Sequence, residues 1–165
     1  MGKRLVSRRS WRPGALFAEH AIRPDFIDNW ATRLRDADSR SARAWAEAVF
    51  TVQFRPVLLL MRLRNALVKP MALFGRAPAP ADLSRGMRPF TTLAAGDGEV
   101  VLGEDDSHLD FRVDLQVHPR FVSVATVVEI HNRLGRLYWS VVRWFHPAIV
   151  RAMLRRAPTV ADPQG

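Results

Sequence analysis

The chain has 165 residues, of which 48% are hydrophobic, and this is enough apolar material for the core of one domain. It contains no cysteine, which excludes disulfides, thiolate zinc sites and thiol nucleophiles and fits a reducing cytoplasm. The formal net charge of +9 comes almost wholly from arginine, because Lys3 and Lys69 are the only lysines. This charge is compatible with acidic partners and with anionic membrane surfaces. Binding to nucleic acid is not expected, because the sequence has no nucleic-acid-binding motif.

The N-terminal region is basic and poor in pattern. We expect residues 1–13 to form a flexible arm, residues 14–158 a single α+β domain, and residues 159–165 a disordered tail. The segment Ser7-Arg8-Arg9-Ser10-Trp11 is similar to a twin-arginine export signal, but charged residues stand where its apolar core should follow. No apolar run is long enough to span a membrane, so we expect a cytoplasmic protein without a transmembrane segment.

The first half of the domain is expected to hold one strand and two short helices. Residues 25–35 mix aromatic, apolar and polar residues in a pattern that favours a strand. Asp38 or Ser39 can cap a helix over residues 41–50, and a second helix begins near Pro56 and ends at Pro70 or Gly75. The proline- and glycine-rich residues 75–89 then form a loop.

Four further strands and their turns are indicated by residues 90–131. Residues 90–95 and 100–102 flank a Gly-Asp-Gly turn, which is the pattern of a hairpin. Residues 108–117 alternate strictly, with one apolar row and one polar row, and a turn at His118-Pro119-Arg120 returns the chain into an antiparallel strand over residues 121–131. Pairing of the two strands is expected to give the sheet one apolar face and one charged face.

The last element is a long helix that begins near Gly135, ends at about Ala157 and is expected to kink at Pro147. On a helical wheel, arginines form a narrow stripe and apolar residues cover most of the remainder. This is more apolar surface than one sheet covers. The excess can meet the second helix in a packed core, a bound apolar ligand, a second protomer in a homodimer, or a membrane surface.

Two polar groupings are candidate sites. Hairpin pairing is expected to bring together a candidate catalytic cluster, near Asp105 and Asp106, that consists of His108, Asp110, Glu129 and His131. The alternative is a solvated sheet face whose charges pair across strands. The spacing of these residues matches no known metal-binding signature. Asn132, Arg133 and Arg136 stand at a helix start that could bind an anion, although Asn132 can equally serve as the cap. His146 lies in an apolar helix and is expected to be a core histidine.

The common catalytic motifs are absent from the sequence. There is no G-x-G-x-x-G, P-loop, G-x-S-x-G or H-E-x-x-H pattern, so the sequence lacks the motifs that usually carry nucleotide binding, phosphoryl transfer and hydrolysis. We therefore expect no cofactor and favour a protein that is not an enzyme.

A family resemblance lies in three segments: Leu102-Gly103-Glu104-Asp105-Asp106-Ser107-His108-Leu109-Asp110-Phe111-Arg112-Val113, then Asn132-Arg133-Leu134-Gly135-Arg136-Leu137-Tyr138, then Trp144-Phe145-His146 with Ile149-Val150-Arg151. They resemble the bacterial domain family DUF2867. The resemblance implies a domain without an assigned activity that is found alone or behind a short-chain-dehydrogenase-like domain. The order of elements also resembles the helix-grip class of the START and Bet v 1 proteins, in which a sheet and a helix enclose an apolar pocket.

Three functions follow from these patterns. The first is a non-catalytic domain that binds an apolar small molecule or lipid between the sheet and the last helix, with Phe111, Val124, Trp139 and Phe145 as wall residues. The second is an enzyme, or an accessory to a short-chain-dehydrogenase-like oxidoreductase, that uses the polar cluster. The third is a peripheral membrane or protein-docking module that uses the arginine-striped helix and the basic arm.

Overall fold

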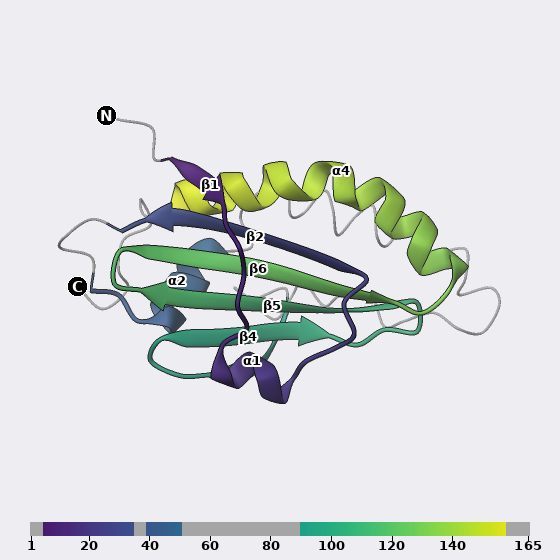
Figure 1. Ribbon diagram of the computed structural model, residues 1–165, viewed down its shortest axis with the longest axis horizontal. Helices are drawn as coiled ribbons and strands as arrows, with labels where there is room; N and C mark the ends of the chain where they lie inside the picture. Colours follow the sequence, from purple (N-terminus) through teal and green to yellow (C-terminus); the bar gives the residue numbers. More distant parts are fainter. Residues whose placement is uncertain (1–4, 35–38, 51–89, 158–165) are drawn as a thin grey trace.

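A six-stranded antiparallel sheet forms the centre of the computed structural model, which describes residues 5–34, 39–50 and 90–157. The elements are β1 (Val6–Arg8), α1 (Ala15–Glu19), β2 (Phe26–Arg33), α2 (Ala42–Val49), β3 (Thr91–Ala95), β4 (Glu99–Glu104), β5 (Leu109–His118), β6 (Phe121–Ile130) and α4 (Arg133–Arg156). The strand order is β1-β2-β6-β5-β4-β3, and α4 extends beside β2 along one margin of the sheet (Figure 1). The expected α+β class, with early short helices and a long C-terminal helix on the sheet, is confirmed.

The register of β5 and β6 is the one that the alternation predicts. Leu115 pairs with Val124 and Val113 with Thr126, so the apolar row of β5 and the matching row of β6 share one face. The predicted hairpin at residues 90–102 is confirmed as β3 and β4, and the strand predicted at residues 25–35 is β2. The second predicted helix and the loop at residues 75–89 lie outside the described residues.

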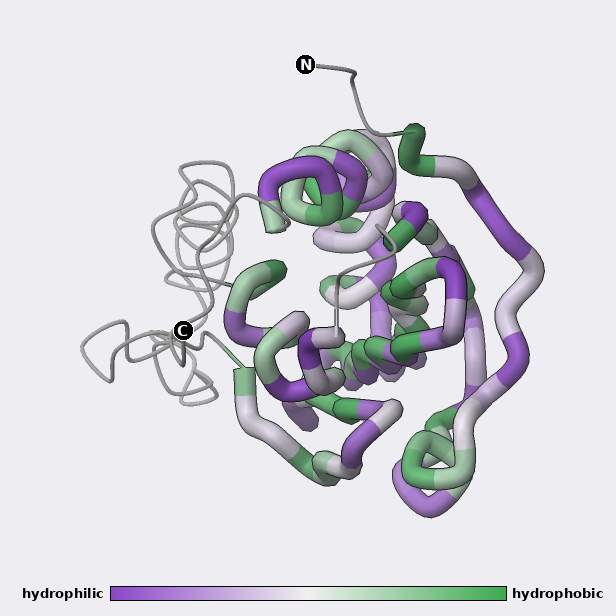
Figure 2. The backbone as a smooth tube through the Cα atoms, turned by 90° about the vertical axis from the view of Figure 1, so that its left-hand side faces the viewer, coloured by the Kyte–Doolittle hydropathy of each residue, from purple (hydrophilic) through white to green (hydrophobic). Residues whose placement is uncertain are grey.

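The main core lies on the face that α2 and α4 cover (Figure 2). Trp45 of α2 and Leu154 of α4 are fully buried there against Leu115, Val122 and Val124 of the sheet. Burial of a large apolar side chain contributes about 1.5–3 kcal/mol, so this layer fixes both helices on the sheet. Of these helices, α2 begins one residue after Ser41, whose hydroxyl accepts from the Ala44 amide, and not after the expected Asp38 or Ser39.

The opposite face of the sheet is covered by the N-terminal segment, residues 9–24, which passes across the strands (Figure 2). Trp11 Nε1 donates to Asp114 Oδ2 at 2.8 Å, and Phe17 is buried against Val101 and Val127. Residues 6–8 of the expected basic arm form β1 and pair with β2. The charged row of β5 is therefore not a solvated face: Asp114 is only 1% exposed.

The C-terminal helix α4 begins at Arg133, two residues before the predicted start, because Asn132 caps it. Asn132 Oδ1 accepts from the amides of Leu134 and Gly135 at 3.0 and 3.1 Å. Pro147 lies inside the helix. In the described ranges, no helix is both long enough and apolar enough to cross a membrane.

Candidate functional site

Polar side chains of β2 are buried beneath α4. Because side chains alternate along a strand, Phe26, Asp28, Trp30 and Thr32 point to the same face of the sheet, against which α4 packs. Asp28 is 4% exposed, and its carboxylate lies 3.2 Å from Arg8 Nε and accepts a hydrogen bond of 2.6 Å from Trp30 Nε1. The sheet thus supplies two donors to this buried acid.

The side of α4 above β2 carries an indole and an imidazole. Trp139 and His146 are seven residues apart and so share a helix face, and both contact Phe26, with ring centroids 4.9 and 6.2 Å away. Their own centroids are 5.6 Å apart. Burial lowers the pKa of His146 to about 4, although the charge of Asp28 opposes this. His146 is therefore neutral near pH 7, with one ring nitrogen as donor and one as acceptor.

Four buried atoms along this interface have no hydrogen-bond partner in the described part of the chain. They are Trp139 Nε1, His146 Nε2, Arg151 Nε and Thr32 Oγ1. A buried polar group without a partner costs about 1–3 kcal/mol, and such groups in proteins usually meet a water molecule or a ligand. We call these four residues, together with the ring of Phe26, the α4–β2 site.

The predicted catalytic cluster comes together where β5 begins and β6 ends. Asp110 pairs with Glu129 in the register, and the amide of His131 donates to the carbonyl of His108 at 3.0 Å. The pairing of the two strands thus brings all four candidate residues to one end of the hairpin, as the sequence predicts.

Within that end, His108 is buried, with 2% of its surface exposed. Its Nδ1 lies 3.0 Å from Asp106 Oδ1, close enough for an ion pair but without the alignment of a hydrogen bond. Asp105 is exposed and pairs with Arg112 at 2.6 Å. His108 and its neighbouring acids thus have partners within the fold.

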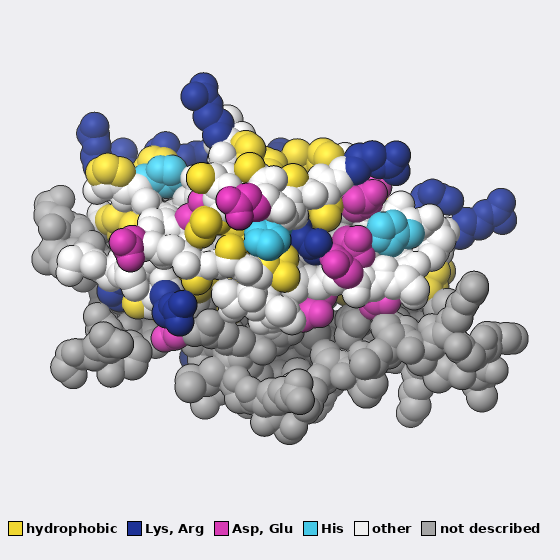
Figure 3. All heavy atoms as spheres, turned by 90° about the horizontal axis from the view of Figure 1, so that it is seen from below, with side chains coloured by type: hydrophobic (Ala, Val, Ile, Leu, Met, Phe, Trp, Pro, Cys, Tyr) yellow, Lys and Arg dark blue, Asp and Glu magenta, His cyan; other side chains and the backbone are white. Residues whose placement is uncertain are grey.

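The remaining candidates are also engaged. His131 Nε2 lies 3.1 Å from Asp110 Oδ2, and the Glu129 carboxylate accepts from the amide of Arg23 at 2.9 Å. Among the described residues, no group of three or more His, Asp or Glu side chains is arranged to hold a metal ion. Around α1 and β4, acidic, histidine and basic side chains are interspersed (Figure 3). The cluster therefore consists of the pairs His108–Asp106 and His131–Asp110, which are linked by the Asp106 amide that donates to Asp110 Oδ1 at 2.9 Å.

The four predicted wall residues do not lie together. Val124 is buried in the main core, and Phe111 packs against both this core and the cluster that holds Trp139. Phe145 is 57% exposed on the outer side of α4. Three of the four thus face the interior between sheet and helix, and Phe145 faces outward.

The predicted anion site is partly occupied by the protein itself. The Asn132 side chain takes two of the first amides of α4, and its Nδ2 donates to the Ser107 carbonyl at 2.8 Å. Arg133 and Arg136 are exposed on the first turn. Capping by Asn132, the alternative to anion binding, is what the structure contains.

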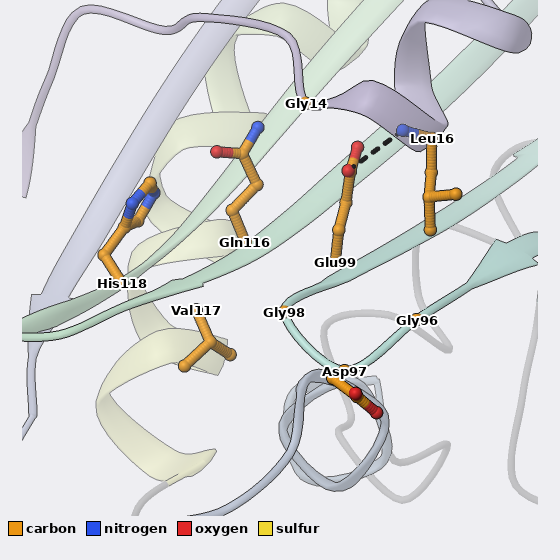
Figure 4. Close-up of a pocket in the computed structure, with 9 residues that line it drawn as sticks. All are labelled: Gly14, Leu16, Gly96, Asp97, Gly98, Glu99, Gln116, Val117 and His118. Atoms are coloured by element: carbon orange, nitrogen blue, oxygen red, sulfur yellow. Dashed lines mark hydrogen bonds between the residues drawn. The ribbon is translucent and has the colours of Figure 1, made fainter.

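A shallow pocket of about 380 Å³ lies beside the turn at residues 96–98 (Figure 4). Its acid, Glu99, accepts from the amides of Leu16 and Phe17 at 3.0 and 2.8 Å. Its amide, Gln116, donates to the Arg12 carbonyl and to Asp114. These groups hold the N-terminal segment on the sheet, so we assign the pocket a structural role.

The sequence reasoning missed the environment of Asp114. Burial raises the pKa of Asp114 to about 6, against the hydrogen bonds from Trp11 and Gln116 that lower it. A signal was present in β6, where residues 122–128 are apolar or small at nearly every position. A strand of this kind is buried on both faces.

A family model described as a protein of unknown function, DUF2867, matches residues 20–153. The chain belongs to the DUF2867 family. No curated protein and no solved structure matches it. Within this DUF2867 domain, every residue of the α4–β2 site lies inside the matched range, whereas β1 and α1 precede it.

Proposed function

We propose that this DUF2867 domain binds an apolar small molecule or lipid between the sheet and α4, with the polar end of the ligand at the α4–β2 site. The observation that carries the proposal is the group of buried donors without partners beside aromatic rings. Ligand sites for apolar molecules combine such walls with a few polar groups that fix the orientation of the ligand.

The chemistry of the site favours an uncharged oxygen at the polar end of the ligand. The Trp139 indole can only donate, and neutral His146 can donate or accept. Arg151 adds a guanidinium that lies over the Trp30 ring at 5.2 Å. A carbonyl oxygen can accept from these groups, and a hydroxyl can also donate to the imidazole.

The arrangement of elements supports the same function. An antiparallel sheet with a long C-terminal helix on it is the plan of the helix-grip class, and we assign the domain to that class as part of this proposal. In this arrangement the ligand lies between helix and sheet, which is where the α4–β2 site is found.

The test is native mass spectrometry of protein purified gently from its own host, with the denatured mass as control. We expect the wild type to retain an apolar molecule of defined mass. The Trp139→Phe variant keeps an aromatic ring but loses the donor. Loss of one hydrogen bond of about 1–1.5 kcal/mol is expected to lower affinity about tenfold.

A matched control is Trp45→Phe. Like Trp139, Trp45 is buried with an indole nitrogen that has no partner among the described residues, but it lies on α2 in the main core. We expect Trp45→Phe to retain the molecule at the wild-type level. A wild type that carries no apolar molecule, or equal retention by wild type and Trp139→Phe, would refute the proposal.

A further inference from the structure

An apolar stripe lies on the outer side of α4, away from the sheet. Four large side chains are exposed there: Leu137 (60%), Val141 (38%), Trp144 (74%) and Phe145 (57%). Their spacing of four, three and one residues places them on one side of the helix, across about two turns. We call these four residues the outer stripe.

The outer stripe is separate from the side of α4 that stabilises the fold. The buried residues of the helix include Trp139, Val142, Val150 and Leu154, which pack toward the sheet and α2. Isolated exposed apolar residues are ordinary, but a contiguous group on one helix indicates an interaction surface. Solubility alone would favour polar residues at these positions.

The charges on α4 indicate which kind of partner the outer stripe fits. The helix contains six arginines and no acidic residue over its 24 residues. Arg133 lies one turn before Leu137 on the same side, and Arg136 and Arg143, seven residues apart, are exposed along one edge of the stripe. The Arg143 guanidinium lies 5.5 Å from the centroid of the Trp144 ring. The surface thus combines an apolar band with a purely positive border.

We propose that the outer stripe docks the domain on the surface of an anionic lipid bilayer, with α4 parallel to the membrane plane. Tryptophan and phenylalanine side chains enter the boundary between headgroups and acyl chains, while arginines contact lipid phosphates. A helix of this length spans about 36 Å, and α4 lies at a margin of the molecule, where a flat surface can reach it (Figure 1).

A second copy of the chain fits the surface less well. Two α4 helices packed stripe to stripe would bring the arginines of both copies together without an acidic residue on either helix, and like charges across an interface are unfavourable. Phosphate groups of a bilayer supply the missing negative charge. This docking does not depend on the α4–β2 site, because Trp139 and His146 of that site are on the side of α4 that faces the sheet, whereas the outer stripe is exposed.

The test is flotation of the full chain with vesicles of equal parts phosphatidylcholine and phosphatidylglycerol, and with vesicles of phosphatidylcholine alone. We expect binding to the anionic vesicles that weakens as salt is raised. Trp144→Ser removes the most exposed member of the stripe and is expected to weaken binding about tenfold or more. The matched control, Ile27→Thr, changes an exposed apolar residue on the opposite face of the sheet and is expected to bind as the wild type does.

A spectroscopic variant locates the contact. Trp144→Phe keeps an aromatic group, so binding is expected to persist, while the blue shift of tryptophan emission on binding is expected to disappear. The inference is overturned if the wild type fails to float with anionic vesicles at low salt, or if Trp144→Ser floats equally well. A concentration-dependent dimer that Trp144→Ser abolishes would overturn it in favour of a second copy.

Discussion

Asp114 is expected to make the stability of the fold fall as pH rises. Its carboxyl is buried beneath the N-terminal segment, and burial raises its pKa from 3.8 to about 6. Between these pH values the folded state binds more protons than the unfolded state, so protonation of Asp114 favours folding. The stabilisation is complete below about pH 3.8 and is lost as pH rises through about 6.

The size of the effect follows from the two pKa values. A difference of about two corresponds to about 3 kcal/mol in the free energy of unfolding. Replacement of Asp114 by Asn removes the titration and keeps an oxygen that can accept from Trp11 and Gln116. The stability of Asp114→Asn relative to the wild type should therefore rise by about 3 kcal/mol from about pH 4 to about pH 7.

The assay is urea unfolding of both proteins at a series of pH values, with tryptophan fluorescence as the signal. The quantity of interest is the difference in the free energy of unfolding between variant and wild type at each pH, because other groups that titrate alike in both proteins cancel from it. A difference that stays constant across the series, or that falls as pH rises, would show that Asp114 is not a buried acid with a raised pKa.

Two further variants probe α4. Burial lowers the pKa of His146 from 6.5 to about 4, so protonation of this side chain destabilises the folded state as pH falls through this range. The free energy of unfolding of His146→Leu, relative to the wild type, should therefore increase by about 3 kcal/mol from about pH 7 to about pH 4. Urea unfolding at both pH values measures this difference, and a decrease would contradict the prediction. A Cβ at Gly135 would overlap the carbonyl oxygen of His108, so Gly135→Ala should destabilise the protein by about 2 kcal/mol or more, although Ala normally stabilises a helix by about 1 kcal/mol. Thermal unfolding measures the effect of Gly135→Ala as a change in Tm. A higher Tm for this variant would mean that α4 can move away from His108.

The strands and the last helix were predictable because their sequences are periodic. The alternation through β5 gives a row of side chains that only one pairing with β6 can bury, and the structure has that register. β1 and α1 were missed because three and five residues are too short for a periodic signal. β1 forms by pairing with β2, and α1 is held by Glu99, to which the amides of Leu16 and Phe17 donate. Local sequence does not contain the information on these distant partners.

The candidate sites show a similar limit. The hairpin pairing of His108, Asp110, Glu129 and His131 follows from strand register, so their meeting at one end was predictable. Phe145 was placed on the inner wall because apolar residues cover most of the circumference of α4, and a helical wheel does not say which apolar side meets the sheet. The structure decides this through Gly135, which allows the helix start to approach His108.

The N-terminal segment also constrains the order in which the chain can fold during synthesis. β2 pairs with β6 on its central side, and Trp11 donates to Asp114 of β5. The first residues of the domain therefore cannot make their native contacts until nearly all the others have left the ribosome. Contacts of such long sequence separation carry a large loop-closure cost and make folding slow. Until β5 and β6 arrive, β2 can pair only with β1, and its other edge stays exposed. This interval is when the nascent chain depends most on chaperones or dilution to avoid aggregation.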